Sequence, residues 1–277
     1  MFKYLFFIST SLFIFNTSLA YVPIPISIPN FIEELEDHEV LIPYPSDRAS
    51  KPLRTIINLL VWNIYKAKRD QLYPDLEYLS GGKDLILLQE TVNDPDFFSF
   101  TQIINWTYWL TAASFRQSSG FETGVTSGFI QNPINSFFLR SPDREPILNT
   151  PKMVLGNIFK IDSHTNLLVL NIHAINFVTN AAHRRQIDQA VEVISQHRGP
   201  VIFAGDFNTW NRWRMNYVKS ALAEVGLKPA ILDGESDISG LDHIFTRQIE
   251  VLDFQILSHI RSSDHSPLVA SVKIQKP

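Results

Sequence analysis

The strongest constraint on the fold is a series of short apolar runs, each ending in polar residues. Four of these runs cover residues 56–62, 85–88, 167–170 and 201–204, and they lead into Asn63, Gln89-Glu90, Asn171-Ile172-His173 and Gly205-Asp206. Continuous apolar runs of this length are typical of strands buried on both faces of a sheet. The sequence therefore predicts a buried sheet whose strands end at polar side chains.

Helical patterns lie between these runs. The clearest spans 183–198, where Ile187, Ala190, Val191 and Ile194 recur at helical spacing, and a second spans 213–225. Pro74 and Pro95 suit the first turns of two further helices, the latter after a capping Asp94. Strands are also expected near 125–130 and 153–161, but the rest of 111–160 cannot be ordered. Alternating strands and helices predict a layered α/β domain.

The first twenty residues have the composition of a signal peptide. Lys3 supplies a positive start, residues 4–15 are apolar, and Ser18-Leu19-Ala20 is a small-x-small cleavage site. An apolar helix of this length would span only about 18 Å, short of a hydrocarbon core of about 30 Å. We therefore expect cleavage after Ala20, export to the periplasm or the medium, and no stable membrane span.

Residues 21–52 differ from the remainder of the chain. They contain prolines at positions 23, 25, 29, 43, 45 and 52 around an acidic patch of Glu33, Glu34, Glu36 and Asp37. This composition predicts an extended N-terminal arm outside the core. Residues 53–277 are then expected to form one catalytic domain, and the chain is expected to be a monomer.

Charge and cysteine content limit the chemistry. The formal charge of the 277 residues is -4, and loss of Lys3 with the leader would make it -5. A protein that binds long nucleic acid mainly by releasing counterions is expected to be basic, so the net charge weakens a nuclease interpretation. Since the chain has no cysteine, any metal ligands are oxygen atoms or imidazoles.

The polar residues after the runs each have an ordinary explanation. An Asp or Asn after a strand is usually a turn former or a helix cap, and a single His beside an apolar run is usually structural. Those explanations do not predict a whole ordered set at consecutive strand ends. The set comprises Asn63, Glu90, His173, Asp206, Asn208, Asp242, Asp264 and His265.

The blocks around these residues resemble those of a known superfamily. They are Trp62-Asn63, Leu88-Gln89-Glu90, 171–176 (NIHAIN), 205–208 (GDFN), 241–245 (LDHIF) and 263–267 (SDHSP). In this order they are similar to the signature blocks of the endonuclease/exonuclease/phosphatase superfamily, over roughly residues 56–273. The resemblance implies a DNase I-like, four-layered α/β sandwich, in which helices flank two packed sheets of mixed or antiparallel strands.

The same resemblance implies a metal-dependent phosphoesterase. Hydrolysis of a phosphate ester requires neutralisation of the phosphoryl oxygens, an oriented water and donors for the developing charge. The oxygen ligands Asn63, Glu90 and Asp264 suit Mg²⁺ or Mn²⁺. Whether Asp264 belongs to this metal shell or to a second metal site stays open.

Roles for the other polar residues also come from the resemblance. Asp206 would position or activate water, Asn208 would contact the phosphate, and Asp242 would orient the imidazole of His265. His173 would donate to a phosphoryl oxygen or to the leaving group. Asn176 would make a further phosphate contact. Relatives support the equivalent of His173 with a glutamate, which we cannot locate between residues 115 and 131.

The segment Trp210-Asn211-Arg212-Trp213-Arg214 interleaves aromatic and basic residues. Trp210 and Arg212 are therefore candidate contacts to a nucleic-acid substrate. Alternatively, Trp213 starts a helix and packs inward while both arginines are solvated. Lys66, Lys68 and Arg69 could line the same edge.

The leading interpretation is a nuclease or related phosphodiesterase. Its rivals are a sphingomyelinase-like lipid phosphodiesterase and an inositol-phosphate phosphatase. The lipid reading needs an exposed aromatic hairpin, for which Phe97-Phe98 with 106–110 is the candidate, although core positions suit these residues better. An exported binding or effector module that keeps the fold without the chemistry is the non-enzymatic alternative.

Overall fold

The computed structural model describes residues 32–44, 46, 49–104, 108–231 and 240–275. The expected signal peptide and the first part of the expected arm lie outside these residues. Within the described part of the chain, no helix combines the length and the apolar character needed to cross a membrane.

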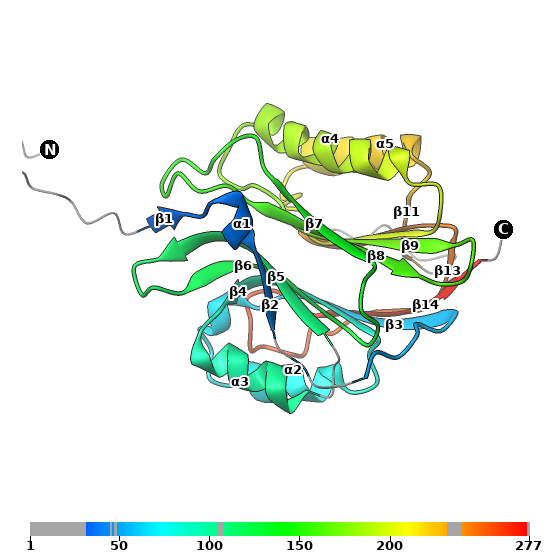
Figure 1. The fold of residues 1–277 in the computed structure, drawn as a ribbon. Helices are drawn as coiled ribbons and strands as arrows, with labels where there is room; N and C mark the ends of the chain where they lie inside the picture. Colours follow the sequence, from blue (N-terminus) through cyan, green and yellow to red (C-terminus); the bar gives the residue numbers. More distant parts are fainter. Residues whose placement is uncertain (1–31, 45, 47–48, 105–107, 232–239, 276–277) are drawn as a thin grey trace, which may run out of the picture. The chain divides into compact units, whose positions relative to one another are not determined.

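Two sheets form the body of the domain (Figure 1). The eight-stranded sheet has the order β1-β5-β6-β4-β3-β14-β13, and β2 also pairs with β5. Its strands are β1 (Ile32–Glu34), β2 (Leu41–Tyr44), β3 (Ile56–Asn63), β4 (Leu85–Val92), β5 (Tyr108–Gln117), β6 (Glu122–Phe129), β13 (Ile249–Ile256) and β14 (Leu268–Ile274).

The six-stranded sheet has the order β11-β12-β10-β9-β8-β7. Its strands are β7 (Asn135–Arg140), β8 (Met153–Lys160), β9 (Asn166–His173), β10 (Val201–Asp206), β11 (Lys228–Pro229) and β12 (Asp242–Arg247). In each sheet one parallel pair, β3 with β4 and β9 with β10, lies among antiparallel neighbours. Both sheets are therefore mixed.

Period-two alternation along each strand builds the layers. In β3, Leu59 and Val61 join the core between the sheets, whereas Leu60 and Trp62 join a second cluster beneath the helices. Helices α2 (Leu72–Ser80) and α3 (Pro95–Ile103) cover that outer face, and α4 (Asn180–Gln196) and α5 (Arg212–Glu224) cover the other sheet. The expected four-layered α/β sandwich is confirmed.

Local sequence sets where these helices begin and which faces they bury. Asp94 caps α3 by accepting a 2.8 Å hydrogen bond from the Phe97 amide, with Pro95 at the first helical position. In α4, Ile187, Ala190 and Ile194 are buried against the six-stranded sheet. A short 3-10 helix, η1 (Tyr65–Ala67), follows β3, and α1 (Asp37–Val40) separates β1 from β2.

Residues 32–44 correct the expectation of an arm outside the core. Strands β1 and β2 both pair with β5, and Leu35 and Val40 are buried in the core between the sheets. Pro43 is tolerated because β2 is a short strand at the border of the sheet. The alternation of buried and exposed residues in this proline-rich segment was not recognised from the sequence, because it depends on pairing with β5. Strands β5 and β7 were likewise not predicted within the unordered 111–160 stretch.

Candidate active site

The polar strand ends of both sheets meet at one place. Parallel pairing puts the ends of β3 and β4 together in one sheet and those of β9 and β10 together in the other. Strand β12 runs antiparallel to β10 with Asp242 directly opposite Asp206. The loop that carries Asp264 and His265 is held by the Trp62 indole, which donates a 2.9 Å hydrogen bond to the His265 carbonyl.

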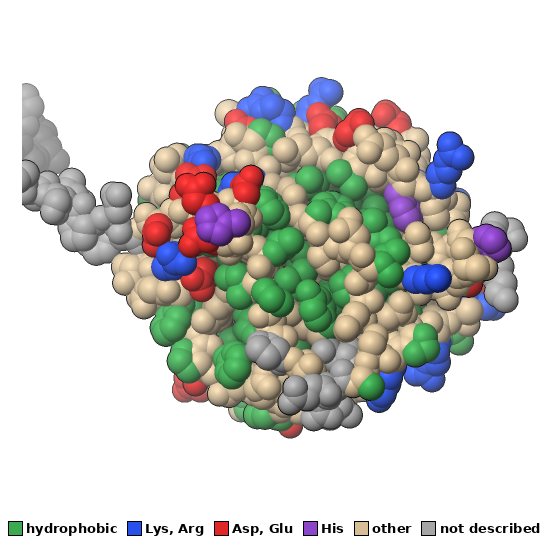
Figure 2. Space-filling view, viewed as in Figure 1, with side chains coloured by type: hydrophobic (Ala, Val, Ile, Leu, Met, Phe, Trp, Pro, Cys, Tyr) green, Lys and Arg blue, Asp and Glu red, His purple; other side chains and the backbone are tan. Residues whose placement is uncertain are grey.

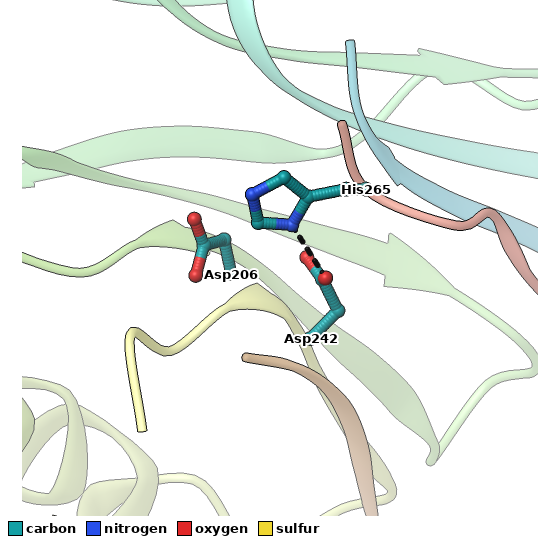
Figure 3. Close-up of side chains that lie close together, drawn as sticks. All are labelled: Asp206, Asp242 and His265. Atoms are coloured by element: carbon teal, nitrogen blue, oxygen red, sulfur yellow. Dashed lines mark hydrogen bonds and ion pairs between the residues drawn. The ribbon is translucent and has the colours of Figure 1, made fainter. Parts of the chain in front are cut away.

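Asp206, Asp242 and His265 form a compact cluster (Figure 3). His265 Nδ1 lies 2.6 Å from Asp242 Oδ2, which fixes the tautomer so that Nδ1 donates to the carboxylate. One ligand atom from each of the three residues falls within 4.8 Å of the others. The expected Asp242–His265 pair is therefore present in the structure, with Asp206 beside it.

Burial and mutual charge set the protonation of this cluster. Burial lowers the pKa of His265, but the hydrogen bond and charge of Asp242, together with Asp206 and Asp264, raise it to about 9. Burial, with the nearby charge of Asp242, raises the pKa of Asp206 to about 7. Burial also raises the pKa of Asp242, against the opposing effect of His265. At neutral pH, His265 is therefore protonated, and the Asp206 carboxyl group beside it is close to its pKa, so it can take up or release a proton.

His173 and Glu90 complete the other side of the cluster. His173 Nε2 lies 3.6 Å from Asp206 Oδ2 and 3.8 Å from Glu90 Oε1. Burial, with the positive charges of Lys152, His265 and Lys66, holds the pKa of His173 well below its usual range, so its ring is neutral at neutral pH. The acidic neighbours of His173 are thus Glu90 and Asp206, and not a glutamate from 115–131.

Glu90 has an unusual backbone conformation. Its φ is 56°, in the left-handed region that non-glycine residues seldom adopt, and it lies at a register shift in the pairing of β4 with β6. This bulge re-aims the side chain into the cavity that also contains Asp264. Left-handed φ at non-glycine residues clusters at functional sites, and Asn208 shares it, with a φ of 51°.

The two asparagines are hydrogen-bonded to Asp206. Asn63 Nδ2 donates to Asp206 Oδ2 at 3.1 Å, while its Oδ1 accepts from the Tyr65 amide at 3.1 Å. Asn208 donates its backbone N–H to Asp206 Oδ1 at 2.9 Å and its side-chain amide to the Ala174 carbonyl at 2.8 Å. Here both residues orient Asp206. Their predicted roles as metal ligand and phosphate contact stay predictions.

A cavity of about 400 Å³ opens onto these groups. Its lining includes Glu90, His173, Asp206, Asn208, Asp264 and His265 from the predicted set, together with Asn176. Lys66 also lines it, as expected, whereas Arg69 instead donates to the Ser263 carbonyl and so holds the His265 loop. This volume suits a small ligand or the reacting part of a larger one.

Two charged residues of the cavity were missed. Glu145 and Lys152, from the loop between β7 and β8, pair at 3.4 Å, and both line the cavity. Glu145 also accepts a 3.0 Å hydrogen bond from the Asn176 amide. No apolar run or motif marks this loop, so its position follows only from the pairing of β7 with β8.

The aromatic-basic segment is divided between two environments. Trp210 is 57% exposed and donates its indole N–H to Asn176 Oδ1 at 3.0 Å. Arg212 is exposed, and neither it nor Trp210 lines the cavity. Arg214 is fully buried beneath the Trp210 ring and donates to the carbonyls of Asn208 and Val178, so the alternative in which both arginines are solvated is wrong for Arg214. Trp213 is 44% exposed and stacks on Tyr217.

The donor set fits a divalent cation. Among the described residues, Asp242 Oδ1 is buried without a hydrogen-bond partner, and the carboxylates of Glu90 and Asp264 face the same cavity as His265. Buried carboxylates are stable when paired with protons or cations. Oxygen-rich sites of this kind favour hard cations such as Mg²⁺ or Mn²⁺.

Comparison with known proteins gives matches over most of the chain. A model described as the Endonuclease/Exonuclease/phosphatase family matches residues 60–265. A UPF0294 protein of Vibrio parahaemolyticus is 34% identical over 221 residues, covering 78% of this chain and 77% of that protein. A UPF0294 protein of Yersinia pseudotuberculosis is 35% identical over 224 residues, covering 79% and 84%.

Solved structures share the fold at lower identity. An endonuclease/exonuclease/phosphatase from Beutenbergia cavernae has a TM-score of 0.64 at 15% identity, covering 80% of this chain and 72% of that one. A mannosyl-6-phosphatase from Bacteroides thetaiotaomicron has a TM-score of 0.57 at 14% identity, covering 78% and 99%. The human Nocturnin catalytic domain with bound sulfate anion has a TM-score of 0.56 at 17% identity, covering 81% and 97%.

Proposed function

The chain belongs to the endonuclease/exonuclease/phosphatase family, and on that premise we propose that it is a divalent-metal-dependent phosphodiesterase. One observation carries the proposal. Carboxylates and imidazoles from β4, β9, β10, β12 and the loop before β14 line or adjoin a single cavity. Helix capping or turn formation, residue by residue, would not bring them together.

The reaction would use the protonation states of this cluster. Asp206 accepts a proton from the attacking water, whose oxygen then bonds to phosphorus as the bond to the leaving alcohol breaks. The protonated His265 donates to a phosphoryl oxygen and stabilises the charge that develops there. His173 donates to another phosphoryl oxygen or to the departing alcohol.

The remaining residues would orient these groups. Asn63 and Asn208 hold Asp206 by hydrogen bonds, and Asp242 fixes the His265 ring. A Mg²⁺ or Mn²⁺ ion held by Glu90, with Asn63 or Asp264, would supply Lewis-acid neutralisation of the phosphate. Asn176 lines the cavity and would contact the phosphate, with Trp210 held against it.

Export and the monomeric state are parts of this proposal that rest on sequence alone. The signal-peptide pattern of residues 1–20 supports secretion or a periplasmic location. The mature chain would then meet extracellular nucleic acid, small phosphate esters or membrane lipids, and these are the substrates to compare.

A substrate panel tests the proposed reaction. Purified protein would be assayed with Mg²⁺, Mn²⁺ or chelator on supercoiled plasmid, sphingomyelin, bis(p-nitrophenyl) phosphate and an inositol phosphate. We expect turnover of at least one diester that chelator abolishes. Metal binding without turnover of any ester would instead favour an inactive binding module of the same fold.

Turnover of the inositol phosphate alone would favour the phosphatase alternative. That outcome has some support, because a fold neighbour is a phosphatase. Nicking of plasmid would favour the nuclease interpretation that the sequence puts first.

A further inference from the structure

Exposed apolar side chains lie on three loops at or next to the cavity. In the loop between β7 and β8, Ile147 is 85% exposed and Leu148 is 46% exposed. In the loop after β9, Phe177 is 73% exposed, and Trp210 follows β10 at 57%. Leu148 and Phe177 themselves line the cavity. We call these four residues the apolar rim.

Hydrogen bonds through Asn176 hold the three loops of the apolar rim together. Its backbone N–H donates to Glu145 at 3.0 Å, while its Oδ1 accepts from the Phe177 amide at 2.9 Å and from the Trp210 indole at 3.0 Å. Phe177 also has a φ of 53°, a left-handed conformation that is unfavourable for a non-glycine residue. A large apolar side chain is thus kept in solvent beside the cavity at an energetic cost.

Four arginines at this end of the sandwich are in ion pairs with acidic side chains. Arg116 contacts Glu33 and Glu122, and Arg140 and Arg144 contact Asp37 and Glu34. Figure 2 shows acidic and basic side chains gathered together over β1 and α1. Arg185 is likewise paired, with Asp143. A long polyanion needs a track of available cations. Since these four arginines are paired, the basic side chains left for such a track among the described residues are few, chiefly Arg212 and Lys66.

We propose that the apolar rim is a lipid-contacting surface and that the substrate is a phospholipid presented by a bilayer. This inference rests on the proposed phosphodiesterase function and specifies its substrate. The side chains of Ile147, Leu148 and Phe177 would enter the boundary between headgroups and acyl chains, and Trp210 would lie at the headgroup level. The cavity would then receive the headgroup phosphate, near Lys66 and Lys152.

The reaction on the phospholipid is the same diester hydrolysis that is proposed above. The oxygen of water bonds to phosphorus, the bond from phosphorus to one alcohol oxygen breaks, and that alcohol takes up a proton. In the aromatic segment offered by the sequence, Phe97 and Trp109 are buried in the core, and only Phe98 of the described residues 97, 98 and 108–110 is a large exposed apolar side chain, at 46%. The apolar rim lies instead on the loops that follow β7, β9 and β10 of the six-stranded sheet.

The test measures vesicle binding and lipid hydrolysis together. Flotation with vesicles of phosphatidylethanolamine and phosphatidylglycerol would compare the wild type with a triple variant carrying Ile147→Ser, Leu148→Ser and Phe177→Ser. We expect vesicle affinity to fall on the order of 1,000-fold, since each of the three removed side chains accounts for about tenfold. The ratio of phospholipid turnover to turnover of soluble bis(p-nitrophenyl) phosphate should fall with it.

Two further variants serve as controls. Ile134→Ser removes a side chain that is 58% exposed at the other end of β7, about 20 Å along the strand from the loop of the rim. It should leave vesicle binding and soluble turnover unchanged. Phe177→Gly removes the apolar group and relieves the left-handed strain, so it should bind vesicles more weakly without loss of thermal stability.

The outcomes separate the two proposals. A wild type that hydrolyses the soluble diester or plasmid but does not float with vesicles overturns the lipid inference and leaves the phosphodiesterase standing. Equal flotation of the wild type and the triple variant also overturns it. Rim-dependent flotation with no turnover of any ester would support the lipid surface and defeat the catalytic proposal.

Discussion

Acidification should destabilise the folded protein through His183. This side chain of α4 is fully buried, and its Nε2 lies 2.8 Å from the carbonyl of Phe207 in the loop after β10. Burial lowers the pKa of His183 to about 4, against the opposing hydrogen bond to Phe207. Helix α4 and the loop after β10 are therefore joined through the neutral imidazole of His183.

The size of the effect follows from the difference in pKa between the two states. The pKa falls from 6.5 to about 4 on folding, and each pKa unit corresponds to about 1.36 kcal/mol, so protonation opposes folding by about 3 kcal/mol. Between these two values the unfolded chain binds more protons than the folded one. The free energy of unfolding must therefore fall as the pH is lowered from about 6.5 to about 4.

Urea unfolding at several pH values measures this contribution. The wild type should lose about 3 kcal/mol more than His183→Gln over that range, because glutamine does not titrate. His164→Gln changes an exposed histidine and should keep the wild-type slope. If His183→Gln and the wild type show the same dependence on pH, the buried neutral imidazole is not the source of the acid sensitivity.

Three substitutions test other parts of the structure. Glu90→Ala should weaken both Mn²⁺ binding, measured by calorimetry, and turnover, because Glu90 lines the cavity as a metal ligand. The control Glu77→Ala, at an exposed position on α2, should change neither. Unchanged metal affinity in Glu90→Ala would refute the ligand assignment. His265→Ala should keep metal affinity and reduce turnover by about 100-fold or more in steady-state assays, and a small reduction would exclude His265 from the reaction. Gly205→Ala would place a Cβ 2.1 Å from the Ile172 carbonyl oxygen at a φ of 135°, so thermal unfolding should show a loss above about 3 kcal/mol. Gly240→Ala meets no such obstacle and should unfold like the wild type.

Much of the candidate active site could be predicted from the sequence because its residues follow buried strands. A continuous apolar run of this length is typical of a strand buried on both faces of a sheet, and parallel neighbours bring their ends to the same edge. Asp206 and His173 therefore meet as expected, since β9 and β10 are such a pair. The pairing of Asp242 with His265 depended in addition on the family resemblance.

The surroundings of the centre could not be predicted in this way. Glu145 and Lys152 come from a loop without periodicity, and their position is fixed only when β7 pairs with β8. Arg214 is buried because its guanidinium donates to backbone carbonyls in the loops after β9 and β10. The contact with the loop after β9 joins segments far apart in the sequence, so no local pattern predicts it. Leu35 and Val40 are core residues because the proline-rich segment that contains them pairs with β5 through β1 and β2.

The central claim is that these strand ends form one cation-dependent centre for phosphate esters. Crystals grown with Mn²⁺ and inorganic phosphate, measured at the manganese edge, test it most directly. We predict an anomalous peak within about 2.2 Å of a Glu90 carboxylate oxygen, typical of such a ligand, with phosphate between it and His265. Mn²⁺ bound elsewhere, with the cavity of Glu90, Asp206 and His265 holding neither ion nor phosphate, would contradict the account.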